Sequence, residues 1–89
     1  MFKTLPNHGT VVSRISLLDP TTGVREIWTG YSDLTLTDEL QYPSGENYFE
    51  IQNPDGSGVG TDVFPNGTGT VTTFGPNRVV ISVAPFTTS

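Results

Sequence analysis

One short segment holds the side chains whose spacing best matches a known chemistry. Oxygen-bearing side chains stand at its first, third and fifth positions, on Asn53, Asp55 and Ser57, and a Gly follows at the sixth. A calcium-binding loop begins in this way, and Asp62 would add a further carboxylate. The twelfth position, where an EF-hand loop needs a bidentate Glu, is Phe64. The segment is therefore a weak candidate for a calcium site. The alternative, which short motifs of this kind more often represent, is a glycine-rich β-turn closed by a side-chain hydrogen bond.

Groups that could carry out catalysis are scarce. The chain has one His, His8, and no Cys, and none of its Ser residues stands in a G-x-S-x-G nucleophile motif. A Ser–His–Asp arrangement would depend on His8 in an extended N-terminal segment, which would not hold the imidazole in a fixed position. The carboxylates are dispersed, and no pair stands out for glycoside hydrolysis. We therefore predict that the protein is not an enzyme, with no catalytic residues and no cofactor apart from the weak calcium candidate.

Aromatic side chains offer a different kind of chemistry. Trp28, Tyr31, Tyr42 and Tyr48 could form a platform on which sugar rings stack, as in a carbohydrate-binding β-sandwich module. The same residue types are also enriched at protein–protein interfaces. The sequence leaves both interpretations open.

Charge and hydropathy exclude several classes of partner. The chain carries 4 basic and 9 acidic residues, for a net charge of −5, and its basic residues are spread along the sequence. Without a basic patch we expect no binding to nucleic acid or to an anionic membrane surface. No apolar run is long enough to span a bilayer, and the first residues contain no apolar signal-peptide core. We therefore expect synthesis in a cytoplasm without secretion by a signal peptide.

The hydropathy pattern of the sequence predicts an all-β fold. Apolar residues alternate with polar ones, and Gly, Pro and Asn mark turns about every ten residues, as in a small sandwich or barrel of mostly antiparallel strands. In the first strand we expect Val11, Ile15 and Leu17 to face inward. About seven strands are predicted, at 10–18, 24–31, 34–37, 47–53, 61–64, 69–74 and 78–83, with a single helical turn at 38–41.

A single β domain at 10–84 is expected between an extended N-terminal arm at 1–9 and a C-terminal tail at 85–89. A chain of 89 residues without Cys builds a small core and has no disulfides, so association with other chains is a natural source of stability. Apolar and aromatic residues in the arm, tail and loops are candidates for such contacts. The predicted partner-binding residues are Phe2, Leu5, Tyr42, Tyr48 and Phe86.

In size, lack of Cys, richness in Thr and Gly, and arm-like ends, the chain resembles the small β-rich accessory proteins of tailed bacteriophage virions, notably capsid decoration (cement) proteins. The resemblance covers the whole chain and involves no specific motif, so it assigns no functional residue. It implies a homo-oligomer, with a trimer favoured, that binds a major capsid or other virion protein. It also implies a location in the virion and a role in bridging and stabilising neighbouring subunits.

Overall fold

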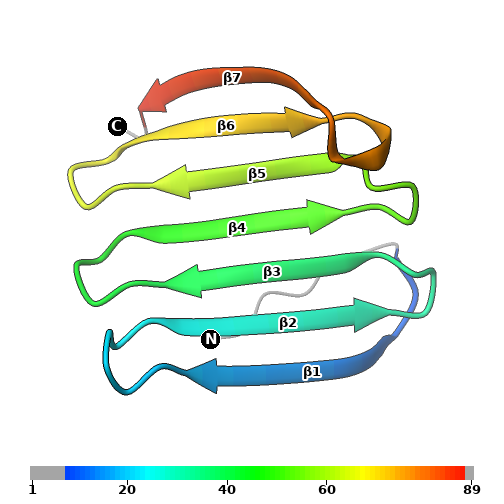
Figure 1. Ribbon diagram of the computed structural model, residues 1–89, viewed down its shortest axis with the longest axis horizontal. Helices are drawn as coiled ribbons and strands as arrows, with labels where there is room; N and C mark the ends of the chain where they lie inside the picture. Colours follow the sequence, from blue (N-terminus) through cyan, green and yellow to red (C-terminus); the bar gives the residue numbers. More distant parts are fainter. Residues whose placement is uncertain (1–7, 88–89) are drawn as a thin grey trace.

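A computed structural model describes residues 8–87, which form one sheet of seven antiparallel strands (Figure 1). The strands follow one another across the sheet in sequence order, so each connection joins neighbouring strands. The all-β class and the seven antiparallel strands are thus confirmed, but the sheet is a single open layer and is not closed into a barrel. Its elements are β1 (Val11–Leu18), β2 (Arg25–Tyr31), β3 (Leu36–Gln41), β4 (Asn47–Gln52), β5 (Gly58–Val63), β6 (Thr68–Phe74), the 3-10 turn η1 (Pro76–Arg78) and β7 (Val80–Thr87).

The hairpin turns follow from their sequences. Between β5 and β6, Gly67 takes a φ of 87°, a conformation that costs glycine little, and the Asn66 side chain accepts a hydrogen bond of 3.0 Å from the Thr68 amide. The Phe64 amide then donates to the Thr68 carbonyl at 2.8 Å. The Pro-Asn-Gly sequence thus forms a turn, with a positive φ at Gly67 but not at Asn66, where a type I′ turn would also need one, and this turn sets the register of the β5–β6 hairpin.

The helical turn predicted at 38–41 is wrong. These residues form most of β3, which lies between β2 and β4 and pairs with both. Asp, Glu, Leu and Gln favour a helical turn when they are considered alone. In a central strand, however, ladders on both sides outweigh that local preference.

The two ends of the chain also differ from expectation. β7 continues through Pro85 to Thr87, so most of the predicted tail at 85–89 belongs to the sheet. The first seven residues of the predicted arm, with Phe2 and Leu5, lie outside the described residues. His8 lies inside them and is half-buried.

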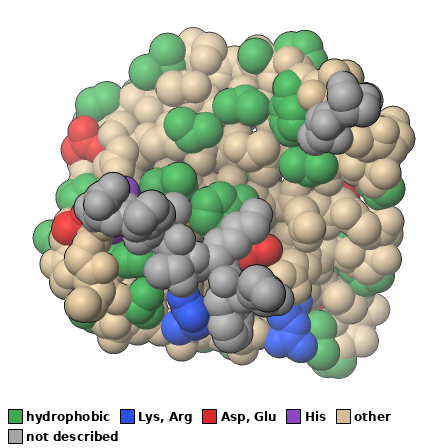
Figure 2. Space-filling view, turned by 180° about the vertical axis from the view of Figure 1, so that it is seen from behind, with side chains coloured by type: hydrophobic (Ala, Val, Ile, Leu, Met, Phe, Trp, Pro, Cys, Tyr) green, Lys and Arg blue, Asp and Glu red, His purple; other side chains and the backbone are tan. Residues whose placement is uncertain are grey.

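Burial is concentrated in the middle of the sheet. Among the described residues, the only fully buried hydrophobic side chains are Ile27 and Tyr31, and the other buried side chains are polar. Among residues 8–87, substantial contacts join only strands that are neighbours in the sheet, so none of the described elements forms a second layer. On the face seen in Figure 2, hydrophobic side chains are scattered among polar ones and basic side chains lie toward the β1 end. The described residues therefore form a small core of hydrophobic side chains.

Candidate assembly interface

The β1 edge of the sheet exposes apolar side chains along its whole length. Every residue of β1 is exposed, and its large hydrophobic side chains point to both faces of the sheet. Ile15, Leu17 and Leu18 are 54%, 56% and 54% exposed, whereas Ile27 on the adjacent strand is 4% exposed. The prediction that Val11, Ile15 and Leu17 face inward is therefore wrong: their alternation is that of a strand, but no layer covers them. An apolar edge of this kind is a template on which another chain can pair.

The backbone of β1 is also open to pairing. The Asp19 amide donates to the Val24 carbonyl at 2.9 Å, which makes these two residues a hydrogen-bonded pair. Since such pairs alternate along an antiparallel ladder, the backbone groups of Arg14, Ser16 and Leu18 point away from β2, toward the free edge. Each of these three residues retains its amide, so the edge offers alternating donors and acceptors without interruption.

The opposite edge, β7, is interrupted. From the Phe64–Thr68 hydrogen bond, the same alternation places the backbone groups of Val83, Pro85 and Thr87 at the free edge. Pro85 has no amide hydrogen, so the middle of this edge lacks a donor. A register shift between Thr73 and Phe74 marks a bulge in the β6–β7 ladder, and one between Val11 and Ser13 marks a bulge at the start of the β1–β2 ladder, so Pro85 is what distinguishes the two edges. Proline and bulges are devices by which proteins block pairing at sheet edges.

The side chains of β1 carry little charge. The strand contains one charged residue, Arg14, whose Nε donates to Thr29 Oγ1 at 3.3 Å. The neighbouring Arg25 donates from its guanidinium to Ser16 Oγ at 2.7 Å. No carboxylate lies on β1, so its surface carries apolar, hydroxyl and basic groups.

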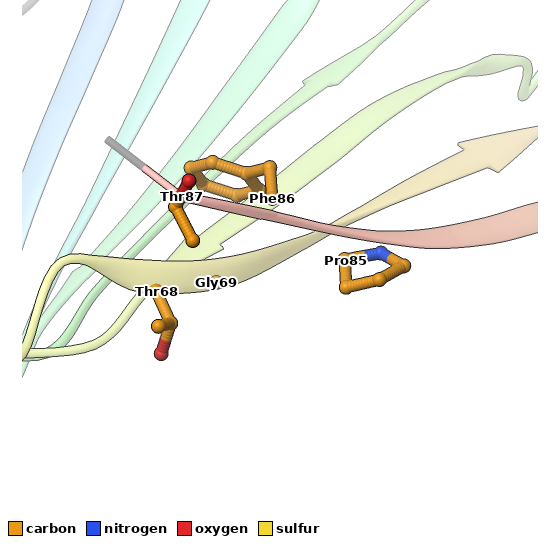
Figure 3. A pocket seen from close by; sticks show the side chains of 5 residues that line it. All are labelled: Thr68, Gly69, Pro85, Phe86 and Thr87. Atoms are coloured by element: carbon orange, nitrogen blue, oxygen red, sulfur yellow. The ribbon is translucent and has the colours of Figure 1, made fainter. Parts of the chain in front are cut away.

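Phe86, one of the predicted contact residues, lies at the end of β7. Its ring lies against Gly69, where an added Cβ would be 2.7 Å from two ring carbons. Figure 3 shows the ring on one side of the β6–β7 ladder, with Thr68 and Pro85 on the other side. These residues and Thr87 line a shallow cavity of about 440 Å³. Phe86 is therefore half-buried within its own chain and leaves only part of its ring for a partner.

Tyr42 and Tyr48, also predicted as contact residues, serve the chain itself. The Tyr48 hydroxyl donates a hydrogen bond to Glu50, and the ring lies over Gly60. Desolvation, followed by the bond to Glu50, raises the pKa of Tyr48 far above its usual value. Tyr42 begins the turn to β4, where its amide donates to the Glu46 carbonyl at 3.0 Å. Both residues are half-buried.

The predicted four-residue aromatic platform does not form. Trp28 and Tyr48 share one face of the sheet, which we name the Trp28 face, but Tyr31 points to the opposite face and is only 2% exposed. An interpretation that uses all four aromatic residues is therefore wrong. Trp28 and Tyr48 share one surface, and Tyr42 lies near Asp38, Asp62 and Glu26 of the same face.

Carboxyl groups gather in the middle of the Trp28 face. Asp38 lies opposite both Trp28 and Glu50, and burial, a hydrogen bond with Glu26 and the nearby charges of Glu26 and Glu50 raise the pKa of Asp38 to about 7. Glu50 is 5% exposed and forms an ion pair of 2.6 Å with Arg78. The Arg78 guanidinium also stacks 4.0 Å from the Phe74 ring centre. This network ties η1 to the sheet.

The calcium candidate takes the shape of a turn. Asp55 Oδ1 accepts hydrogen bonds from the amide and hydroxyl of Ser57 at 2.9 and 2.6 Å, and Asn53 Nδ2 donates to Ser57 Oγ at 3.2 Å. Asp62 is four residues further along β5 than Gly58, roughly 13 Å away along the strand, and pairs with Tyr48. Within residues 8–87, no group of three His, Asp or Glu side chains is arranged to hold a metal ion.

His8 makes more contacts than its predicted place in an arm implies. Its Nδ1 lies 2.8 Å from Asp33 Oδ2 and 3.2 Å from Thr35 Oγ1. A catalytic triad places the carboxylate and the hydroxyl on opposite ring nitrogens, whereas here both lie at the same nitrogen. The Thr35 amide, followed by the side chains of Thr35 and His8, lowers the pKa of Asp33. The cluster fastens the start of the described chain to the β2–β3 turn.

Residues 8–87 contain no helix of the length and hydropathy needed to cross a membrane. Comparison with known proteins found no match: no family model fits the sequence, and neither a curated protein nor a solved structure is similar to it. The arguments below therefore depend on the geometry of the chain.

Proposed function

We propose that the protein is a non-enzymatic structural component of a symmetric assembly and binds other protein chains through the open edge of its sheet. The observation that carries this proposal is β1, an exposed strand with apolar side chains on both faces and an uninterrupted row of outward backbone groups. A soluble domain that functions alone blocks or covers such an edge. An edge of this kind suits addition of a strand from a partner.

The small core supports the same proposal. Within residues 8–87, two fully buried hydrophobic side chains are few for a sheet of seven strands. Stable domains usually bury one face of a sheet against a second layer. A partner that covers β1 and part of a face would supply the missing apolar burial, at roughly 25 cal/mol for each Å² removed from water.

The finer form of the proposal comes from the resemblance to capsid decoration proteins of tailed bacteriophages. In that role the chain would bind the assembled shell and not the free shell subunits. Because binding only to the assembled state shifts the equilibrium toward it, the shell would be stabilised by mass action. The expected location is the virion, and the expected partner is a major capsid or other virion protein.

The test is the native mass of the purified protein, measured by light scattering on a sizing column from about 1 to about 500 μM, a range that covers weak interfaces. We expect a mass that rises with concentration to a closed oligomer. A folded monomer of constant mass over the whole range would contradict self-association. Binding of that monomer to an assembled virion shell would then be the remaining support for a structural role.

A second candidate function is carbohydrate binding, favoured by the shared face of Trp28 and Tyr48 and by nearby polar side chains such as Gln52. Stacking of a sugar ring on Trp28 would be the main contact. Titration with a panel of polysaccharides, repeated on Trp28→Ala, separates the two functions. Binding that disappears in the variant supports a carbohydrate module, and no binding in either protein removes this alternative.

A further inference from the structure

We propose that the first partner of β1 is β1 of a second copy of this chain, so that two sheets join edge to edge about a twofold axis perpendicular to them. This proposal rests on the proposed function, since it names the partner of the same edge. A twofold axis of this kind reverses the strand direction and keeps each face of the sheet continuous. The two β1 strands are therefore antiparallel, and each dimer presents one doubled surface per face.

The spacing of residues in β1 selects one register. The outward backbone groups belong to Arg14, Ser16 and Leu18, so Ser16 at the twofold axis pairs with itself, and Arg14 pairs with Leu18 of the other copy on either side. In this register each of these three residues stands opposite one of the same three residues in the other copy. Shifting the register by two residues in one direction leaves Arg14 opposite residue 20, beyond β1, and shifting it in the other direction sets Leu18 opposite Val12, at the bulge between Val11 and Ser13.

The same register matches the side chains. Ile15 and Leu17 lie one residue on either side of Ser16 and point to the Trp28 face, so each Ile15 lies opposite the Leu17 of the other copy. Such a pair sits between hydrogen-bonded pairs, where Cα atoms are about 4.5 Å apart and side chains are closest. Four apolar side chains that are now more than half exposed would form one cluster.

Charge also favours this register. Arg14 is the one charged residue of β1 and lies opposite Leu18 of the other copy, whose side chain can cover the aliphatic part of Arg14. A register centred on residue 14 would place the two Arg14 side chains directly opposite each other, which is unfavourable. The self-pairing of β1 therefore avoids like-charge contact while joining its apolar residues.

A pairing between β1 and β7 of another copy is less favourable. Pro85 lacks an amide at the middle of the β7 edge, so one carbonyl on the incoming strand would lose its donor. A trimer that continues the sheet from copy to copy would repeat this defect at every interface. The twofold pairing of β1 has no such defect.

Cysteine cross-linking tests the register, because the chain contains no native Cys. Ser16→Cys places two thiols on paired residues with Cα atoms about 5.5 Å apart, inside the range for a disulfide. Arg14→Cys and Leu18→Cys each place their two thiols about 13 Å apart, outside that range. Val83→Cys is the control on the other edge, because the backbone groups of Val83 point outward from β7. Each variant is oxidised at about 100 μM, a concentration suited to a weak interface, and the dimer is measured on a non-reducing gel.

We expect Ser16→Cys to form dimers at least about tenfold faster than Arg14→Cys, Leu18→Cys or Val83→Cys alone. An equimolar mixture of Arg14→Cys and Leu18→Cys should form a mixed disulfide at a rate near that of Ser16→Cys. The mixture tests the register even if Ser16→Cys fails to fold.

Three outcomes would overturn the proposal: equal rates for all variants, fastest linkage through Val83→Cys, or a mixture no faster than its components. If the unmodified protein still forms oligomers by light scattering, the twofold pairing is wrong and the proposed structural function remains. If it is also monomeric at every concentration and binds no virion shell, the proposed function fails as well.

Discussion

The two edges of this sheet carry similar amounts of exposed hydrophobic surface but differ in their backbones. Leu17 on β1 and Val83 on β7 are 56% and 62% exposed, so side-chain exposure alone does not separate them. At the free edge, however, β1 offers the amides of Arg14, Ser16 and Leu18, whereas Pro85 removes a donor from the middle of β7. We therefore propose β1 as the interface, because apolar side chains and an uninterrupted row of backbone donors occur together on it.

The largest effect should come from a charge placed in the proposed β1 contact. Leu17→Lys sets an ammonium group opposite Ile15 of the second copy at two symmetry-related positions, and desolvating both groups opposes association. We expect the dissociation constant, measured by sedimentation equilibrium, to rise at least about a hundredfold. Val83→Lys on β7 is the control and should leave the constant within about twofold of the unmodified value. An equal loss in both variants would place the interface on both edges.

The next largest effect on association should come from removing a backbone donor from the β1 edge. Ser16→Pro removes the amide at the twofold axis, and with it two hydrogen bonds of the dimer that together contribute about 1–3 kcal/mol. We expect about 5- to 150-fold weaker association, with a far-UV circular dichroism spectrum unchanged in shape, because edge strands tolerate Pro.

Pro85→Thr makes the opposite change and restores a donor at the β7 edge. With both edges open, a chain can pair at each end, so light scattering should show species larger than the dimer at the highest concentrations. A mass identical to that of the unmodified protein would show that Pro85 is not what blocks β7.

A change in the middle of the sheet should affect stability and leave association unchanged. Glu50→Gln removes the negative charge that pairs with Arg78 at 2.6 Å and accepts a hydrogen bond from Tyr48. We expect the free energy of unfolding in urea to fall by about 1–3 kcal/mol. The dissociation constant of the dimer, measured without urea, should stay the same. A large change in that constant would mean that the interface extends onto the Trp28 face.

The smallest effect concerns pH. Burial, with the neighbouring carboxyl groups of Glu26 and Glu50, raises the pKa of Asp38 to about 7 from an unfolded value of 3.8. The folded chain therefore holds a proton that the unfolded chain releases between these values, so the Asp38 contribution to stability decreases as pH rises from about 4 to about 7. Asp38→Asn should flatten the dependence of melting temperature on pH in this range. A slope identical to that of the unmodified protein would remove Asp38 as its source.

Local patterns in the sequence predicted most of the strands because period-two alternation and turn residues act over short distances. The turn at Asn66-Gly67 is an example, since its hydrogen bonds all lie within residues 64–68. Residues 38–41 were predicted wrongly because their neighbours β2 and β4 decide their conformation. The alternation of Ile15 and Leu17 indicated a strand but carried no information on whether a second layer covers it.

The candidate interface was harder to predict than the fold. Sequence reasoning favoured aromatic residues as contacts, and in the structure Tyr48 covers Gly60 and bonds to Glu50. The sequence signal for the β1 edge proposed here is that β1 contains no Pro and no Gly and a single charged residue, Arg14. In an antiparallel hairpin, alternate residues point their amides toward the neighbouring strand and the others point them outward. The turn geometry decides which set points outward, and the sequence pattern alone does not show it.

The most direct test of the β1 interface is amide hydrogen exchange, measured by NMR at about 20 μM and about 1 mM, which brackets a weak dissociation constant. Pairing of β1 with a second copy predicts that exchange at the Arg14, Ser16 and Leu18 amides slows as concentration rises. The Val83 and Thr87 amides on β7 should exchange at the same rate at both concentrations. Exchange on β1 that does not depend on concentration, or slowing confined to β7, would contradict β1 self-pairing.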